Sequence, residues 1–180
     1  VLSEKESYFP DEACALSVEE LQKLKEGYID NISLLYPNAQ CVTDKRPENY
    51  LYVGLIKQLF PKAKFIWTQR EPCDNAISAY FQYLGQGMNY ATSLDDTLQY
   101  ADEMQRLKQH WQSLYPDSIY TFDYDQFVRQ PEQVLRDLLR FLNIEWNDSF
   151  LNYHERRNPV KTASVWQVRR PLYRSSSGRS

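Results

Sequence analysis

The chain has 180 residues, of which 42% are hydrophobic, 14% aromatic and 25% charged, and its formal net charge is −3. This length is enough for a core of its own, and the aromatic content excludes a largely disordered protein. The negative net charge gives no reason to expect binding to nucleic acid or to an anionic membrane.

The first predicted elements are a helix, a short strand and a second helix. Ser17 and Glu20 have the spacing of a capping box, and apolar residues follow at helical spacing until Pro37 ends the run. A short strand is expected over residues 41–43. Pro47 then suits the first turn of the second helix, because proline lacks only an N–H that would be unpaired there.

Further along the chain, strands are predicted over residues 64–68 and 118–122, where β-branched and aromatic residues cluster between turn residues. A helix is expected from about Cys73 to Gly85, and another opens at Pro131. Between them Ser93 caps a long helix that ends near Tyr115, with one apolar side formed by Leu94, Leu98, Ala101, Leu107, Trp111 and Leu114. The alternation predicts one α/β domain over residues 1–180, with a parallel sheet of at least three strands.

Polar segments follow the predicted strands, at residues 43–46, 69–71 and 123–125. Ligands of open parallel sheets bind beyond the carboxyl ends of the strands, so these segments mark a candidate site. Arg70 at a strand end and Ser78 on the next helix could grip a phosphate from two sides. The plainer interpretation, an exposed arginine and an ordinary helix serine, fits the same spacing.

Lys45 has a similar pair of interpretations. It is either a solvated loop charge or a cation that stabilises charge on a group in transfer. A basic run from Arg156 to Arg179 is likewise either a solvated tail or an anion-binding segment.

Other site classes find little support in the sequence. Neither His110 nor His154 has metal-ligand spacing, and the five glycines form no phosphate-binding GxxxxGK[ST] loop, which disfavours a nucleotide kinase. We expect no metal site. The three cysteines lack CxxC spacing and favour a reducing, cytoplasmic compartment. No apolar run approaches the roughly 20 residues that a membrane-spanning helix needs.

Eight segments occur in one order along the chain: VTDKRPEN (42–49), FPKAKFI (60–66), REPCD (70–74), SAYF (78–81), DYDQFV (123–128), TAS (162–164), QVRRP (167–171) and YRSS (173–176). Together they resemble the sulfotransferase family, most of all bacterial members fused to tetratricopeptide repeats and more distantly the tyrosylprotein sulfotransferases. The resemblance covers roughly residues 36–179. It implies a three-layer, P-loop-type α/β fold around a central parallel sheet.

The resemblance also implies a sulfuryl donor, 3′-phosphoadenylyl sulfate (PAPS), and an acceptor hydroxyl. Arg70 and Ser78 match the pair that binds the 3′-phosphate of the donor, and Tyr124 matches a tyrosine near the adenine. Arg179 matches a basic residue of the final loop that closes over the nucleotide. The acceptor stays open among a carbohydrate, a peptide tyrosine, a lipid and a small molecule.

Two residues match positions that take part in the transfer itself. Lys45 matches a lysine near the sulfuryl group, and Ser164 matches a serine that helps to stabilise the transition state. The implied reaction is an in-line displacement at sulfur that releases adenosine 3′,5′-bisphosphate, and it requires no metal.

The sequence departs from the family pattern at its start. Residues 1–36 contain no loop of the kind that binds the 5′-phosphosulfate, and no general base can be assigned. Glu48 is near Lys45, but a first-turn glutamate is more often a partner of the helix dipole. We therefore expect the C-terminal portion of a sulfotransferase domain, incomplete at the N-terminal side of its sheet, with helical repeats upstream as one arrangement. The alternative is a catalytically inactive nucleotide-binding or protein-interaction module.

Overall fold

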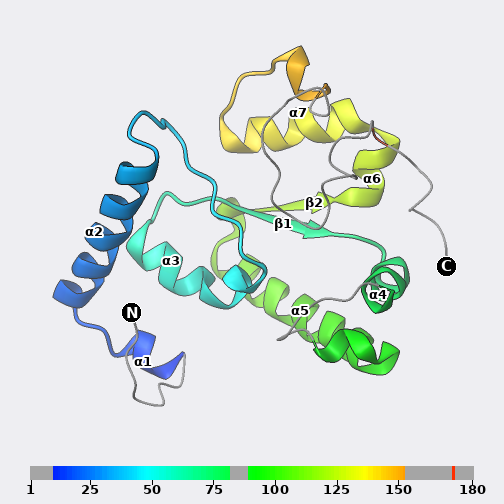
Figure 1. Cartoon of the computed structure of the whole chain (residues 1–180), viewed down its shortest axis with the longest axis horizontal. Helices are drawn as coiled ribbons and strands as arrows, with labels where there is room; N and C mark the ends of the chain where they lie inside the picture. Colours follow the sequence, from blue (N-terminus) through cyan, green and yellow to red (C-terminus); the bar gives the residue numbers. More distant parts are fainter. Residues whose placement is uncertain (1–9, 82–88, 153–171, 173–180) are drawn as a thin grey trace. The chain divides into compact units, whose positions relative to one another are not determined.

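The computed structural model describes residues 10–81, 89–152 and 172 of the chain. The chain divides into two compact units, Val1–Ala63 and Lys64–Ser180 (Figure 1). The predicted site residues Ser164 and Arg179 lie outside the described residues.

The first unit is helical. Its elements are α1 (Asp11–Cys14), α2 (Val18–Leu35), the 3-10 helix η1 (Pro47–Tyr52) and α3 (Val53–Leu59). The predicted capping box is confirmed, because Ser17 Oγ accepts from the Glu20 N–H at 3.2 Å and a Glu20 carboxylate oxygen accepts from the Ser17 N–H at 2.8 Å. These two bonds satisfy backbone donors that the first turn of a helix leaves unpaired.

The strand predicted over residues 41–43 is wrong. These residues form no strand, and all three are exposed. A strand needs a neighbour to pair its backbone N–H and C=O groups, and none of the described residues of this unit forms one. The apolar pattern of a three-residue run therefore did not suffice to specify a strand.

The second unit contains a parallel pair of strands, β1 (Phe65–Gln69) and β2 (Ile119–Asp123). Phe65 lies opposite Ile119, and the register continues to Gln69 opposite Asp123. The predicted strands at 64–68 and 118–122 are thus confirmed with a shift of one residue, and so is their parallel direction. Within the described residues the sheet has two strands rather than three.

Helices surround this pair. They are α4 (Pro72–Tyr80), α5 (Leu94–Leu114), α6 (Tyr124–Arg129) and α7 (Pro131–Leu142), with 3-10 turns η2 (Asn89–Thr92), η3 (Pro116–Ser118) and η4 (Asp148–Phe150). The predicted cap of α5 is confirmed, since Ser93 Oγ accepts from the Asp96 N–H at 3.3 Å. The short helix α6 was not predicted. Asp123 caps it by accepting from the Gln126 N–H at 2.8 Å.

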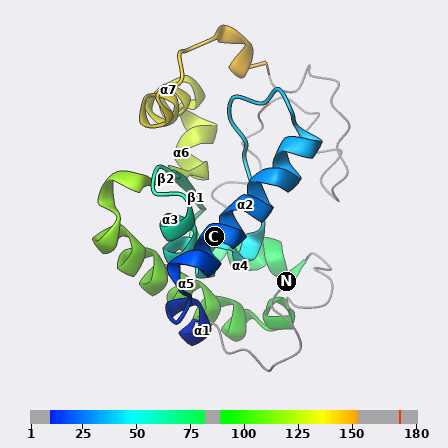
Figure 2. The ribbon, with the colours of Figure 1, turned by 90° about the vertical axis from the view of Figure 1, so that its left-hand side faces the viewer.

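Successive side chains of β2 face opposite layers of helices, as the twofold period of a strand requires. The rings of Tyr120 and Phe122 contact Phe141 of α7 and Phe127 of α6, with centroids 5.4 and 5.1 Å apart. Thr121 faces the other way, and its hydroxyl accepts from α5 at 3.2 Å. Figure 2 shows α7 and α5 on opposite sides of the strand pair. Helices on both faces of a parallel pair are an α/β arrangement.

The predicted apolar side of α5 is only partly correct. Leu94, Leu98 and Leu114 are exposed, whereas Thr97 and Lys108 are buried. Both buried residues have hydrogen-bond partners, and Thr97 Oγ1 donates to the backbone oxygens of Ser93 and Tyr90. A polar side chain with a partner can occupy an interior position, which a pattern of apolar residues does not reveal.

The end of α7 offers a test of the fold. Asn143 has φ 58° and ψ 42°, the left-handed conformation, and the Ile144 N–H donates to the oxygen of buried Leu139 at 2.9 Å. A β-branched side chain is strained in this conformation, by about 1–2 kcal/mol, whereas glycine is not. We expect Asn143→Val to lower the free energy of unfolding by about that amount, and Asn143→Gly to leave it unchanged or slightly raised. Urea denaturation measures both, and equal stabilities would contradict the assigned backbone conformation.

Candidate functional site

Two polar segments meet at the carboxyl ends of the strands, as predicted. Gln69 and Asp123 are the last paired residues of β1 and β2, and Gln69 Nε2 donates to Asp123 Oδ2 at 3.4 Å. The residues that follow, 70–71 and 124–125, therefore leave the sheet next to each other. This is the edge at which open parallel sheets bind their ligands.

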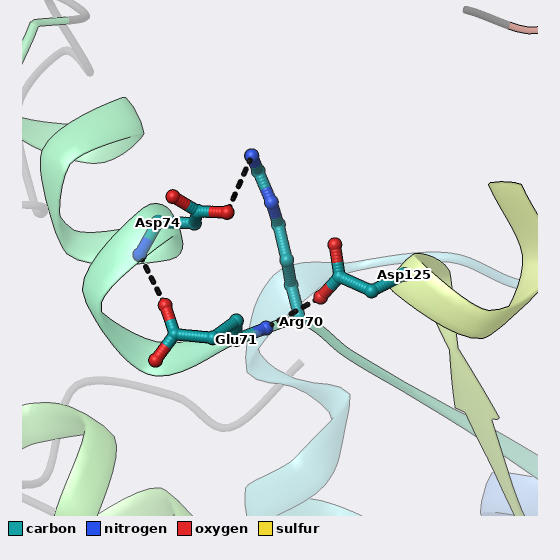
Figure 3. Close-up of polar contacts among 4 residues, drawn as sticks. All are labelled: Arg70, Glu71, Asp74 and Asp125. Carbon is teal, nitrogen blue, oxygen red and sulfur yellow. Dashed lines mark hydrogen bonds and ion pairs between the residues drawn. The ribbon is translucent and has the colours of Figure 1, made fainter. Parts of the chain in front are cut away.

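Arg70 is a largely enclosed cation at this edge. Its side chain is only 16% exposed, and Nη2 lies 3.8 Å from an oxygen of the fully buried Asp74 carboxylate (Figure 3). Its Nε is buried and has no hydrogen-bond partner in the described part of the chain. An unpaired buried N–H is costly, and a bound anion would remove that cost.

Tyr124 contacts Arg70 from the second segment. The Arg70 Cζ lies 5.6 Å from the centroid of the Tyr124 ring, within the range of a cation–π interaction. Tyr124 is the first residue of α6, so the cap by Asp123 fixes where its backbone begins the helix. The structure thus brings together two residues that are 54 positions apart in sequence.

Ser78 belongs to the same unit as Arg70 and is partly buried in α4. It lies one turn after Asp74, and residues four apart share a face of a helix. Glu71 caps this helix, since its carboxylate accepts from the Asp74 N–H at 2.7 Å. No direct hydrogen bond joins Ser78 to Arg70 among the residues described here. Asp74 relates the two residues, because it forms an ion pair with Arg70 and lies one helical turn before Ser78 in α4.

Lys45 lies in the first unit and is exposed. Its neighbour Asp44 is held by two side chains, because Tyr28 Oη donates to it at 3.2 Å and Asn49 Nδ2 donates at 3.4 Å. Burial, and to a smaller extent the Asp44 charge, raise the pKa of Tyr28 above its ordinary value. The segment that carries Lys45 is therefore anchored through the residue before it.

Glu48, which is near Lys45 in sequence, is engaged elsewhere. Its carboxylate lies 3.8 Å from Arg46 Nε in an exposed ion pair. Glu48 also lies in the first turn of η1, which agrees with its plainer interpretation as a partner of the helix dipole.

Two residues of the site were missed in the sequence. Lys108 of α5 is 5% exposed, and its Nζ donates to Gln69 Oε1 at 2.6 Å. Burial lowers the pKa of Lys108, and the charge of Asp123 partly opposes this shift. Asp125 is 8% exposed and accepts from the Glu71 N–H at 2.8 Å. The helical spacing of Lys108 from the half-buried residues Met104 and Trp111 is the pattern that could have identified it.

The described residues contain neither a cluster of metal ligands nor a candidate membrane span. Over residues 10–81 and 89–152, no group of three or more His, Cys, Asp or Glu side chains could hold a metal ion. Among the described helices, none combines the length and the apolar character that crossing a membrane demands.

Three known proteins are similar to the chain over most of its length. A protein of Aquifex aeolicus (strain VF5) named "Uncharacterized protein" is 37% identical over 159 residues, which are 87% of this chain and 21% of that protein. "Protein-tyrosine sulfotransferase 1" of Danio rerio is 28% identical over 138 residues, or 73% of this chain and 37% of the relative. "Protein-tyrosine sulfotransferase" of Drosophila melanogaster is 24% identical over 135 residues, which are 73% of this chain and 27% of the relative. The chain thus spans only about a fifth to a little over a third of these relatives.

A family profile gives the broader assignment. The profile described as "Sulfotransferase family" matches residues 4–148, which is most of the chain and includes both polar segments at the strand ends. This match agrees with the two relatives whose names are those of sulfotransferases. The chain belongs to the sulfotransferase family.

Proposed function

We propose that the chain is the C-terminal portion of a sulfotransferase domain that takes its sulfuryl group from PAPS. The observation that carries this proposal is Arg70, an enclosed cation with an unpaired buried Nε, next to Tyr124 at the carboxyl end of a parallel strand pair. A guanidinium in this setting binds phosphate oxygens strongly, because its N–H groups match their geometry and little water competes. Family membership supports the same chemistry.

In this proposal residues of the second unit hold different parts of the nucleotide. Arg70 and Ser78 bind the 3′-phosphate, Tyr124 contacts the adenine, and Arg179 closes over the nucleotide. The helices on both faces of the parallel pair support a three-layer, P-loop-type sheet as the frame of the whole domain. The three cysteines are free, which supports a reducing compartment such as the cytoplasm.

The transfer is a displacement at sulfur. The acceptor oxygen forms a bond to sulfur while the bond from sulfur to the bridging oxygen breaks, and adenosine 3′,5′-bisphosphate leaves. The proton of the acceptor hydroxyl passes to a base or to water. Lys45 neutralises the charge that develops on the leaving oxygen, and Ser164 donates a hydrogen bond to the transferring group. A positioned donor of this kind contributes about 2.7–4 kcal/mol to the transition state.

The acceptor is a hydroxyl group. Two relatives carry names that specify protein tyrosine, which favours a tyrosyl hydroxyl over a carbohydrate, a lipid or a small molecule as the first acceptor to try. The aromatic residues near α4, such as exposed Tyr80 and Phe81, offer apolar surface but no assigned pocket.

Substitution of Arg70 tests the nucleotide site. Calorimetric titration of adenosine 3′,5′-bisphosphate into the full natural protein that carries these residues should show binding that Arg70→Ala weakens at least tenfold, which is about 1.4 kcal/mol. Arg106→Ala is the matched control, because Arg106 is exposed and its ion pair at 2.8 Å is with Glu103, three residues away on the same helix. Equal affinities for wild type and Arg70→Ala would contradict the site. Absence of binding in all three proteins would favour the protein-interaction module.

Substitution of Lys45 tests the chemical step. We expect Lys45→Ala to lower kcat about 10²- to 10³-fold, the effect of removing one donor from the transition state. The KM for PAPS should change little, because the proposed contact forms with the leaving oxygen. Lys62→Ala removes another exposed lysine of the same unit and should leave the rate unchanged. Sulfate transfer from labelled PAPS to a tyrosine peptide measures the rates, and an unaltered kcat in Lys45→Ala would exclude this role.

A further inference from the structure

Arg70 and Tyr124 are the central residues of two three-residue segments that lie side by side at the carboxyl ends of β1 and β2. Arg70 lies between Gln69 and Glu71, and Tyr124 lies between Asp123 and Asp125. The two central side chains contact each other, and the residues on either side are joined across the gap by hydrogen bonds. The pair is therefore held from both sides.

The first link is made by the last strand residues. Gln69 Nε2 donates to Asp123 Oδ2 at 3.4 Å, and Gln69 Oε1 accepts from buried Lys108 at 2.6 Å. The other oxygen of Asp123 caps α6 through the Gln126 N–H at 2.8 Å. The amide of Gln69 is thus fixed by a donor and an acceptor, and the carboxylate that it contacts also starts the helix of Tyr124.

The second link is made by Asp125, one residue beyond Tyr124. Its Oδ2 accepts from the backbone N–H of Glu71 at 2.8 Å (Figure 3). Asp125 is 8% exposed, so the bond forms between a carboxylate and an amide with little water around them. Charge-assisted hydrogen bonds of this kind are about twice as strong as neutral ones. The bond holds the backbone directly after Arg70 against the first turn of α6.

We propose that Asp125 is a positioning residue that holds Arg70 in the orientation in which it binds the phosphate of the nucleotide. The inference rests on the proposed function. Asp125 bonds to the backbone after Arg70, and its contribution to binding passes through the placement of the guanidinium. Pre-organisation of a binding side chain raises affinity because less freedom is lost when the ligand arrives.

Three variants of the full natural protein test this role by titration with adenosine 3′,5′-bisphosphate. We expect Asp125→Ala to weaken binding about tenfold, or 1.4 kcal/mol. Asp125→Asn keeps an oxygen that can accept from the Glu71 N–H, so its affinity should stay within about threefold of wild type, or about 0.7 kcal/mol. Asp125→Ser keeps a polar group but shortens the acceptor. It should weaken nucleotide binding as much as Asp125→Ala does, and it replaces the alanine variant in the test if that variant does not fold.

The decisive comparison repeats Asp125→Ala, or Asp125→Ser, in an Arg70→Ala background. If Asp125 acts through Arg70, its loss should have little further effect once the guanidinium is gone. A tenfold loss in both backgrounds would indicate a general structural role and overturn the proposal. Wild-type affinity in Asp125→Ala, with weak binding in Arg70→Ala, would overturn the proposal and leave the nucleotide site intact. Absence of binding by the wild-type protein would instead overturn the proposed function on which the inference rests.

Discussion

Gln69 and Asp123 face each other at the carboxyl ends of two parallel strands, and the candidate site is built outward from that pair. Parallel pairing in this register sends both chains out of the sheet at the same edge. The next residue on each chain belongs to the Arg70–Tyr124 contact, and the residues after that are joined by the Asp125 bond to the Glu71 N–H. A shift of one residue in register would turn the side chains of a strand to its other face and separate these partners.

The same edge concentrates buried charge. Asp74 is fully buried, Asp125 and Lys108 are nearly so, and Arg70 is mostly enclosed. Buried ionic groups are costly unless they are paired or hydrogen-bonded, so a fold rarely keeps several of them in one place for stability alone. Here opposite charges and backbone amides compensate most of the cost, and the Arg70 Nε is left without a partner in the described residues. Burial also lowers the pKa of Lys108. Perturbed pKa values gather at functional sites, which agrees with the membership of a transferase family.

Local features of the sequence predicted the helix caps and the positions of β1 and β2, whereas most contacts between distant residues were not predicted. The capping box at Ser17 and the proline at the start of α7 act within a few residues, so their effect can be read directly. The strand expected at residues 41–43 failed because strand formation depends on a distant partner. Lys108 was missed for a related reason, since the side chain that accepts its hydrogen bond, Gln69, is 39 positions away. The polar segments after the strands were predicted because the direction of a parallel strand fixes where its end lies, whereas the bonds between them depend on register.

Discrimination between two nucleotides tests the central claim most directly. Adenosine 3′,5′-bisphosphate and adenosine 5′-phosphate differ only in the 3′-phosphate that Arg70 is proposed to bind. The wild-type protein should bind the bisphosphate at least tenfold more tightly, or 1.4 kcal/mol, and Arg70→Ala should remove most of that difference. Equal affinity of the wild-type protein for both nucleotides would contradict a 3′-phosphate site at Arg70.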